Sequence, residues 1–384
     1  MRALAVSPVS LGRWASPLGL VVIWVVMSVL NPRFLSAVNL TNLMLQIVAV
    51  GAIAVGVVLV LLIGEIDLSV GAVSGLGAAI IAVLVMKEGW PSGLAIVAGL
   101  AAGAAVGLVH ALLVTRIGIP SFVVTLAGLL TWQGTLQLVL GDTGSVNVTD
   151  DGLTAIAGTF LSPAVGWTLA SGVAGAALIT IVHRIRQPDR GRPGHVWRPG
   201  LVAVSSLVAV AVFNADRGTP LAVVLFLVVL ASFDIVARRT RLGRHAMAIG
   251  SNASAARRAG IPVDRIRMVV FALASVLAVT GGILAASRLL AVNQSSGGTD
   301  LMLTAVAAAV IGGTSLFGGR GSVWSALFGS LVVGSLANGL DLLGTSSAVR
   351  SIATGLVLAV AVALDTLARR GELPLRRRRE VQVS

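Results

Sequence analysis

The sequence predicts an all-α membrane protein whose helices cross a lipid bilayer about ten to twelve times. Three observations support this fold class. The composition is 56% hydrophobic and 11% charged, the mean hydropathy is +0.98, and apolar runs of bilayer-spanning length recur from end to end. We therefore expect residues 1–384 to form a single transmembrane domain.

Twelve apolar segments are candidates for the spans. The first is not followed by a small-residue cleavage site, so we expect it to be retained as a membrane helix. Several others are shorter than the ~20 residues that a full crossing needs, which leaves the count of spans open. The segments cover residues 17–30, 46–63, 70–86, 93–114, 121–140, 165–182, 200–213, 219–237, 268–290, 303–317, 322–340 and 346–366.

The positions of the basic residues predict the orientation of the chain. Of the 28 lysines and arginines, 23 fall between the apolar segments that an alternating topology places on one side, and five fall on the other. Basic residues gather on the cytoplasmic side of membrane proteins. We therefore expect a multi-pass protein of the bacterial inner membrane with both termini in the cytoplasm, together with a basic loop at 184–198, a loop at 238–267 and a tail at 367–384.

The net charge of +13 also has to be explained. Nucleic-acid binding is one explanation for such a charge, but these arginines lie in short clusters beside apolar spans, as cytoplasmic loops do. We expect no nucleic-acid partner, and we expect the run Arg376–Arg379 to lie near anionic membrane lipid.

Several chemical functions have no visible motif in this chain. The sequence contains no cysteine, and its single lysine, Lys87, is not part of a phosphate-binding Gly-x-x-x-x-Gly-Lys-Ser/Thr motif. Neither His-Glu-x-x-His nor Gly-x-Ser-x-Gly occurs. We therefore expect a protein without an enzymatic activity, nucleotide site, metal or cofactor of its own.

Two glycine-containing segments interrupt the apolar pattern, at 64–71 and at 311–322. Interrupted helices at corresponding positions in two halves of a transporter mark places where irregular backbone lines a pathway. The simpler alternative is two tight turns between helices. We favour broken or re-entrant segments that contribute to a pathway or gate, with these candidate residues: Glu65, Asp67, Ser69, Gly312, Gly313 and Thr314.

The carboxylates of Glu65 and Asp67 need partners or water, because a carboxylate at the bilayer centre costs ~2.5–3.5 kcal/mol. For Asp67 we favour a capping role, in which Asp67 or Ser69 accepts from the free N–H groups of a helix that restarts near Val70. Glu65 has no such role, unless it lies at the membrane interface. If the pair instead exchanges protons, the protein is an ion-coupled secondary transporter, which is our alternative hypothesis.

The longest polar segment on the basic side contains a short predicted helix at 252–259. Asn252 is a good N-cap, Gly260 a good C-terminal stop, and Pro262 follows. Helices this short are marginal alone in water, so we expect this one to dock on another protein or, alternatively, on the chain's own membrane helices.

Four stretches of the sequence resemble the permease subunits of bacterial ABC importers for monosaccharides, the ribose/xylose/galactose permease family. The resemblance covers roughly residues 30–368, and the additional segment 184–213 resembles the longer xylose-type branch. The matching stretches are Gly64-Glu-Ile-Asp-Leu-Ser-Val-Gly71, Ile119-Pro-Ser-Phe-Val-Val-Thr-Leu-Ala-Gly128, Ala248-Ile-Gly-Ser-Asn252 with Ala255-Ala256-Arg257 and Gly260-Ile261, and Val310-Ile-Gly-Gly-Thr-Ser-Leu-Phe-Gly-Gly-Arg-Gly-Ser322.

The resemblance implies a function that the composition alone does not. It implies two permease subunits, expected here as a homodimer, with a cytoplasmic ABC ATPase subunit and a periplasmic or lipid-anchored sugar-binding protein. The substrate would be a monosaccharide, xylose or a related pentose or hexose, with selectivity largely in the binding protein. The family's coupling element against the ATPase corresponds here to Gly250, Asn252, Ala255, Ala256, Arg257 and Gly260.

Overall fold

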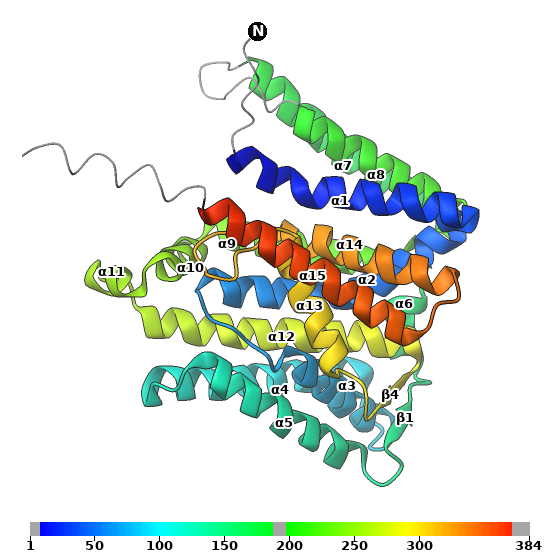
Figure 1. Cartoon of the computed structure of the whole chain (residues 1–384). Coiled ribbons are helices and arrows are strands. Elements are labelled where there is room, and N and C mark those ends of the chain that lie inside the picture. The colour runs from blue at the N-terminus through cyan, green and yellow to red at the C-terminus, as the bar shows by residue number, and fades with distance from the viewer. Residues whose placement is uncertain (1–7, 187–196, 371–384) are drawn as a thin grey trace, which may run out of the picture.

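The computed structural model describes residues 8–186 and 197–370. Within these ranges the chain is built from helices, and its strands form two short antiparallel pairs (Figure 1). The predicted all-α class is confirmed. The basic loop at 184–198 is described only at its two ends, and most of the predicted tail at 367–384 lies outside the described residues.

The elements follow one another without a break between domains. The first half of the chain contains α1 (Pro8–Leu30), η1 (Pro32–Leu35), α2 (Ala37–Leu62), α3 (Val70–Met86), α4 (Ser92–Leu112), the π-helical turn η2 (Leu113–Ile117), α5 (Ser121–Leu140), β1 (Ser145–Asn147), α6 (Asp151–Gly158), β2 (Phe160–Leu161) and α7 (Pro163–Arg186). The second half contains α8 (Trp197–Asn214), β3 (Thr219–Pro220), α9 (Leu221–Arg239), α10 (Arg241–Ser251), α11 (Ala253–Arg258), α12 (Val263–Leu289), β4 (Ala291–Asn293), α13 (Thr299–Ile311), α14 (Trp324–Leu342) and α15 (Ser347–Arg370).

Every predicted apolar segment corresponds to a helix, although not every helix is long enough to cross. Among the described residues, eight helices are long and apolar enough to span a membrane. Shorter apolar stretches occur at Pro17–Leu30, Val70–Met86, Thr299–Ile311 and Ser347–Val360. The short helices α3 and α13 adjoin the two predicted interruptions, so the interruptions shorten helices instead of merely joining complete ones.

Two boundaries differ from the prediction for identifiable physical reasons. The helix predicted at 46–63 begins nine residues earlier, at Ala37, because Ser36 caps it and its first polar residues find partners on a neighbouring helix. Asn39 and Asn338 of α14 exchange amide hydrogen bonds of 2.8 and 3.0 Å. The segment predicted at 303–317 is not one helix, since α13 ends at Ile311 and the apolar residues beyond it belong to a loop.

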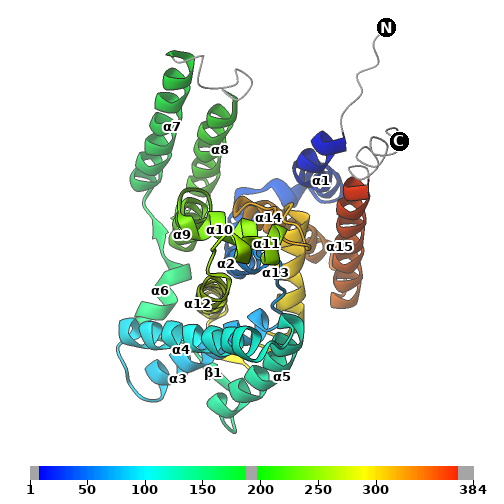
Figure 2. The same cartoon turned by 90° about the vertical axis from the view of Figure 1, so that its left-hand side faces the viewer.

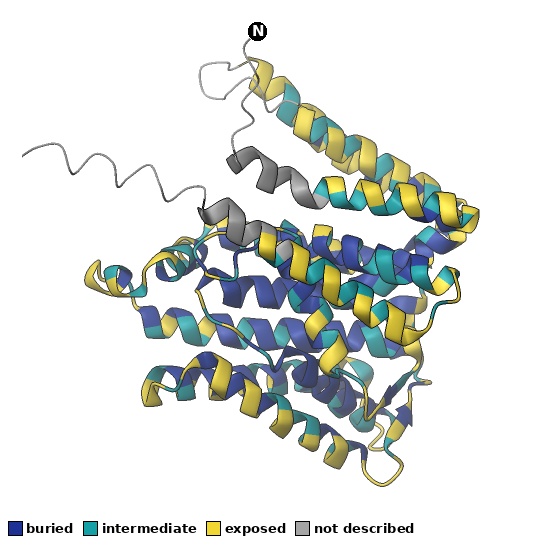
Figure 3. Cartoon of the chain, in the orientation of Figure 1, coloured by how far each residue is buried: buried dark blue, intermediate teal, exposed yellow. Residues whose placement is uncertain are grey.

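The core of the bundle is formed around α2 and α12, which pack on each other. Of the most apolar windows, 83% of that in α2 and 61% of that in α12 is buried, against 17% in α7 and 11% in α8. Figure 2 shows α7 and α8 standing apart from the bundle, and Figure 3 shows their largely exposed surfaces. Exposed apolar faces of this kind suit contact with lipid tails.

Glycines allow α12 to approach its neighbours closely. A Cβ atom at Gly107 of α4 would lie 2.4 Å from the carbonyl oxygen of Phe271, and one at Gly56 of α2 would lie 2.8 Å from that of Ala274. Small residues at helix contacts let backbones come this near in membrane proteins. Both contacts hold α12 between α2 and α4.

The two ends of the bundle differ in structure. The short strands and α6 lie at one end, which we call the β1 side, and α10 and α11 lie at the other, the α11 side (Figure 1). On the β1 side, β1 pairs with β4 and β2 pairs with β3. The described ends of α1 and α15 lie on the α11 side (Figure 1).

Asp150 fastens α6 on the β1 side. Its Oδ1 atom accepts hydrogen bonds from the Ser92 hydroxyl at 2.6 Å and from the Leu153 amide at 2.9 Å. The bond from Ser92, with smaller contributions from backbone amides, lowers the pKa of this carboxyl below its usual value. Asp150 therefore joins the start of α4 to the first turn of α6.

Candidate functional site

The first predicted interruption is a true break between α2 and α3. The helix α2 ends at Leu62, and Gly64 takes a left-handed conformation with φ of +77°. The Glu65 amide still donates to the carbonyl oxygen of Val60, at 3.2 Å, after which the chain is extended to Ser69. The helix restarts at Val70, as the sequence predicted.

Asp67 supports this break, but it does so differently from the predicted cap. Its Oδ1 atom accepts from the amide and the hydroxyl of Ser69, at 2.8 and 2.6 Å. The side chain of Ser69, at the N-cap position of α3, makes no capping hydrogen bond. Asp67 therefore orders the residue before the helix, and its buried Oδ2 atom has no hydrogen-bond partner among the described residues.

Ser69 also joins the break to a buried histidine. His110 of α4 is 2% exposed, and its Nδ1 atom lies 3.5 Å from the Ser69 hydroxyl. The indole N–H of Trp132, on α5, donates to His110 Nε2 at 2.8 Å, which assigns the imidazole proton to Nδ1. A directed chain of polar groups thus connects α5, α4 and the start of α3, and His110 is a hydrogen-bonded core residue.

Glu65 has a partner that the sequence analysis missed. Its Oε1 atom forms an ion pair with Arg267 Nη2 of α12, at 2.6 Å. The side chains are 13% and 21% exposed, so water has limited access to the pair. Glu65 is thereby accounted for as a structural anion that joins the first break to the first turns of α12.

The second interruption is a compact loop between α13 and α14. Gly312 lies against α14, since a Cβ atom there would meet the carbonyl oxygen of Ser325, and Gly313 has φ of +104°. The Ser315 amide donates to the carbonyl oxygen of Arg320 at 3.0 Å, which closes the loop on itself. Thr314 is buried, and its hydroxyl has no hydrogen-bond partner among the described residues.

The structure brings the two interruptions together at a contact that we call the glycine junction, formed by Gly64, Gly250, Gly318 and Gly319. A Cβ atom at Gly318 would lie 2.7 Å from the Cα of Gly64 and 2.8 Å from the carbonyl oxygen of Gly250. The Gly319 amide donates to the carbonyl oxygen of Leu62 at 3.2 Å. The end of α10 therefore touches both broken segments through backbone alone.

A side-chain contact reinforces this arrangement from α9. Arg238 pairs with Asp234 one turn earlier, the predicted intrahelical pair, at 2.6 Å. The same guanidinium donates from Nη2 to the Ser322 hydroxyl, in the second broken segment, at 3.1 Å. The second segment is thus fastened to α9 as well as to the glycine junction.

The short helix predicted at 252–259 is confirmed as α11, and it follows α10 directly. Asn252 Oδ1 accepts from the Ala255 amide at 2.9 Å, and Gly260 has φ of +80°. Figure 1 shows α11 projecting at the end of the bundle. The predicted cap and stop residues therefore both act as expected.

The two alanines of α11 are less accessible than a contact surface for a partner requires. Ala256 is 5% exposed and packs against this chain's own core, and Ala255 is partly buried. The alternative of docking on the chain's own helices therefore holds for this face of α11. Its exposed residues are Asn252, Ser254, Arg257, Arg258 and Ala259.

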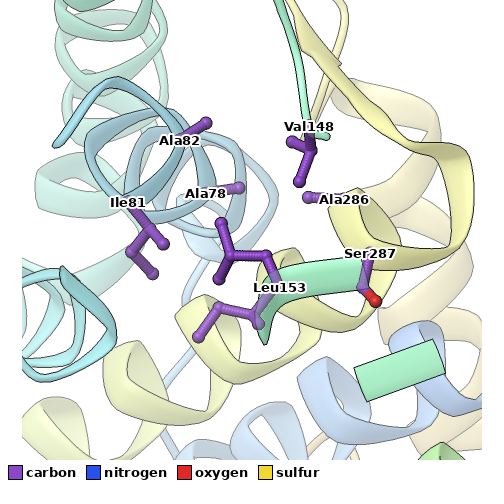
Figure 4. Close-up of a pocket in the computed structure, with 8 residues that line it drawn as sticks. Ala78, Ile81, Ala82, Val148, Leu153, Ala286 and Ser287 are labelled. Atoms are coloured by element: carbon purple, nitrogen blue, oxygen red, sulfur yellow. The ribbon is translucent and has the colours of Figure 1, made fainter. Parts of the chain in front are cut away.

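A small apolar cavity lies on the other side of α12 from the glycine junction. Its volume is about 10 Å³, and it is lined by residues of α3, α6 and α12 such as Ala78, Leu153 and Ala286 (Figure 4). A space of this size holds roughly one water molecule and is too small for a monosaccharide. It is a packing defect and not a binding site.

Three groups of functional candidates were not found from the sequence. Arg267 and Asp264 are two charges one helical turn apart, a spacing that marks one face of a helix but not its partners. Gly318 and Gly319 were noted only as part of a loop, and Trp132 was read as apolar. Pairing between distant segments left no local signal in any of these cases.

Comparison with known proteins places the chain in a family. Residues 39–362 match the family model described as "Branched-chain amino acid transport system / permease component". The matched range contains both broken segments, α10, α11 and α12. The chain therefore belongs to this family of transport permeases, and the resemblance found in the sequence is confirmed.

Curated relatives match nearly the whole chain. The xylose transport system permease protein XylH of Escherichia coli is 36% identical over 347 residues, which cover 88% of this chain and 87% of the relative. The XylH of Haemophilus influenzae is 36% identical over 344 residues (87% and 90%). The ribose import permease protein RbsC of Bacillus subtilis is 32% identical over 348 residues (91% and 91%). No solved structure matches the chain significantly.

The glycine junction makes a direct prediction about stability. We expect Gly318→Ala to lower the stability of the purified protein by about 1–3 kcal/mol more than Gly344→Ala, because the new methyl group would overlap neighbouring backbone. Gly344 is the matched control, since its φ of +70° is close to the +82° of Gly318 but nothing lies within 4 Å of a Cβ there. Thermal unfolding in detergent measures both, and equal losses would show that the junction tolerates a side chain.

Proposed function

We propose that this chain is the membrane-spanning subunit of an ATP-driven importer and that its substrate is a monosaccharide of the xylose or ribose type. The observation that carries the proposal is the glycine junction, where α10, next to the exposed α11, touches both broken segments. A partner that pushes on α11 is thereby in mechanical contact with the irregular backbone of the bundle. The relatives named for xylose and ribose import support the choice of substrate class.

The partner on the α11 side is proposed to be a cytoplasmic ABC ATPase subunit. The exposed face of α11 carries Arg257 and Arg258, and the preceding helices carry further arginines, so the surface is basic. An excess of arginine on this side also supports its cytoplasmic orientation, with both chain termini on the same side. Because the sequence has no nucleotide motif of its own, ATP hydrolysis belongs to the partner.

The other proposed partners follow from the orientation. The β1 side would face the periplasm and receive the sugar from a binding protein. A second copy of the chain would complete the importer as a homodimer, and the exposed apolar faces of the outer helices would contact lipid in the bacterial inner membrane. Glu65, Asp67, Ser69, Gly312, Gly313 and Thr314 would then form or support the gate between the two sides.

The ion-coupled alternative has less support. Glu65 is paired with Arg267, and Asp67 is engaged by Ser69, so both carboxylates have structural partners. We propose that they stabilise the broken segment and do not carry a transported proton.

The energy source and the substrate can be tested in one experiment. We expect vesicles that contain this chain with its ATPase and binding protein to accumulate labelled xylose or ribose when ATP is supplied at the α11 side, and to accumulate neither with a proton gradient alone. Labelled leucine is the comparison substrate, because the family model is described for branched-chain amino acids. Uptake driven by the gradient without ATPase, or uptake of leucine in place of the sugars, would contradict the proposal.

Docking of the ATPase on α11 gives a second test. We expect Arg258→Glu to reduce co-purification of the ATPase subunit by about tenfold, because it reverses a charge at the proposed contact, while the amount of chain in the membrane stays unchanged. Asp142→Arg is the control, since it reverses an exposed charge on the β1 side. Equal association of the ATPase with all three proteins would show that docking uses a different surface.

A further inference from the structure

Two ion pairs meet on the first turns of α12. Arg257 of α11 pairs with Asp264 at 3.0 Å, and Arg267 pairs with Glu65 of the first break at 2.6 Å. Asp264 and Arg267 are three residues apart, so they lie on one face of α12. A continuous series of charges therefore runs from α11, over one turn of α12, to the first broken segment.

The two pairs differ in their exposure to water. The side chains of Arg257 and Asp264 are 62% and 47% exposed, whereas those of Arg267 and Glu65 are 21% and 13% exposed. Salt and water weaken the outer pair more than the inner one. The inner pair is therefore the stronger link, and the outer pair gives it a connection to α11.

The inner pair acts on a point where the backbone is already unusual. Glu65 directly follows Gly64, whose φ is +77°, and its amide is bound to the last turn of α2. The buried Arg267 Nε atom has no hydrogen-bond partner among the described residues, so the guanidinium relies on Glu65 for its ionic contact. A displacement of the first turn of α12 must either move Glu65 or break this pair.

We propose that these two pairs form an ionic linkage, Arg257–Asp264 and Arg267–Glu65, that transmits the displacement of α11 to the first broken segment. Glu65 and Arg267 are then positioning residues for transport. This inference rests on the proposed function, and it adds a route that is separate from the glycine junction. Without the inner pair, the ATPase can dock and hydrolyse ATP while the break no longer follows α11.

The ratio of sugar transported to ATP hydrolysed tests the linkage in the reconstituted complex. We expect Glu65→Gln and Arg267→Gln to lower this ratio by about tenfold, within the usual range of coupling between sites, while ATP hydrolysis continues. Arg267→Lys keeps the charge at a single contact and is expected to keep most of the coupling. Arg350→Gln is the control, because it removes an ion pair with Asp341 between α14 and α15. Transport ratios equal to that of the unmodified chain would overturn the proposal.

A second measurement does not depend on what the chain transports. In the purified full chain, hydrogen exchange of the backbone at 64–69 should become faster with Arg267→Gln and, to a smaller extent, with Arg257→Gln, but not with Arg350→Gln. Unchanged exchange at 64–69 in both linkage variants would overturn the linkage even if the chain imports sugar. A failure of the unmodified complex to transport sugar with ATP would instead contradict the proposed function alone.

Discussion

The close backbone contact among Gly64, Gly250 and Gly318 is the constraint on which the arrangement of this protein depends. Helix α10 and the two broken segments can meet only because none of these positions carries a side chain. The amide of Gly319, bound to the carbonyl oxygen of Leu62, fixes the second segment to the end of α2. The helix ends on the α11 side are thereby held in one packed unit.

This constraint explains why charges are tolerated near the breaks. Ending α2 at Leu62 exposes backbone groups, and the segment that follows carries two carboxylates. Each carboxylate is engaged by a different neighbour, Glu65 by Arg267 and Asp67 by Ser69. A buried charge with a partner costs far less than one without, so the carboxylates hold the irregular backbone in place.

Local features of the site could be predicted from the sequence, because local residues produce them. The break at Gly64, the restart at Val70 and the capped helix after Asn252 each follow from a glycine, a polar residue or a cap within a few positions. The contact between Gly64 and Gly318 joins residues far apart in the chain, and no local pattern marks it. The same holds for the pairing of Glu65 with Arg267.

Burial was the other property that the sequence did not reveal. The alanines of α11 looked alike as candidates, but Ala256 faces the chain's own core while Ser254 and Arg258 face outward. In a helix of six residues there are too few positions for a periodic pattern to show which face is buried. The first helix boundary failed for a related reason, since the polar start of α2 is stabilised by Asn338 from the other end of the chain.

The central claim is that α11 and the first broken segment move together. Because the sequence has no cysteine, spin labels can be attached to single introduced cysteines at the exposed positions Ser254 and Ile66, with Leu343 on the β1 side as a reference. Distances between labels would be measured in the complex with and without ATP. The account predicts that the distance from 254 to 66 stays constant while both distances to 343 change. A change between 254 and 66, with 66 fixed relative to 343, would contradict it.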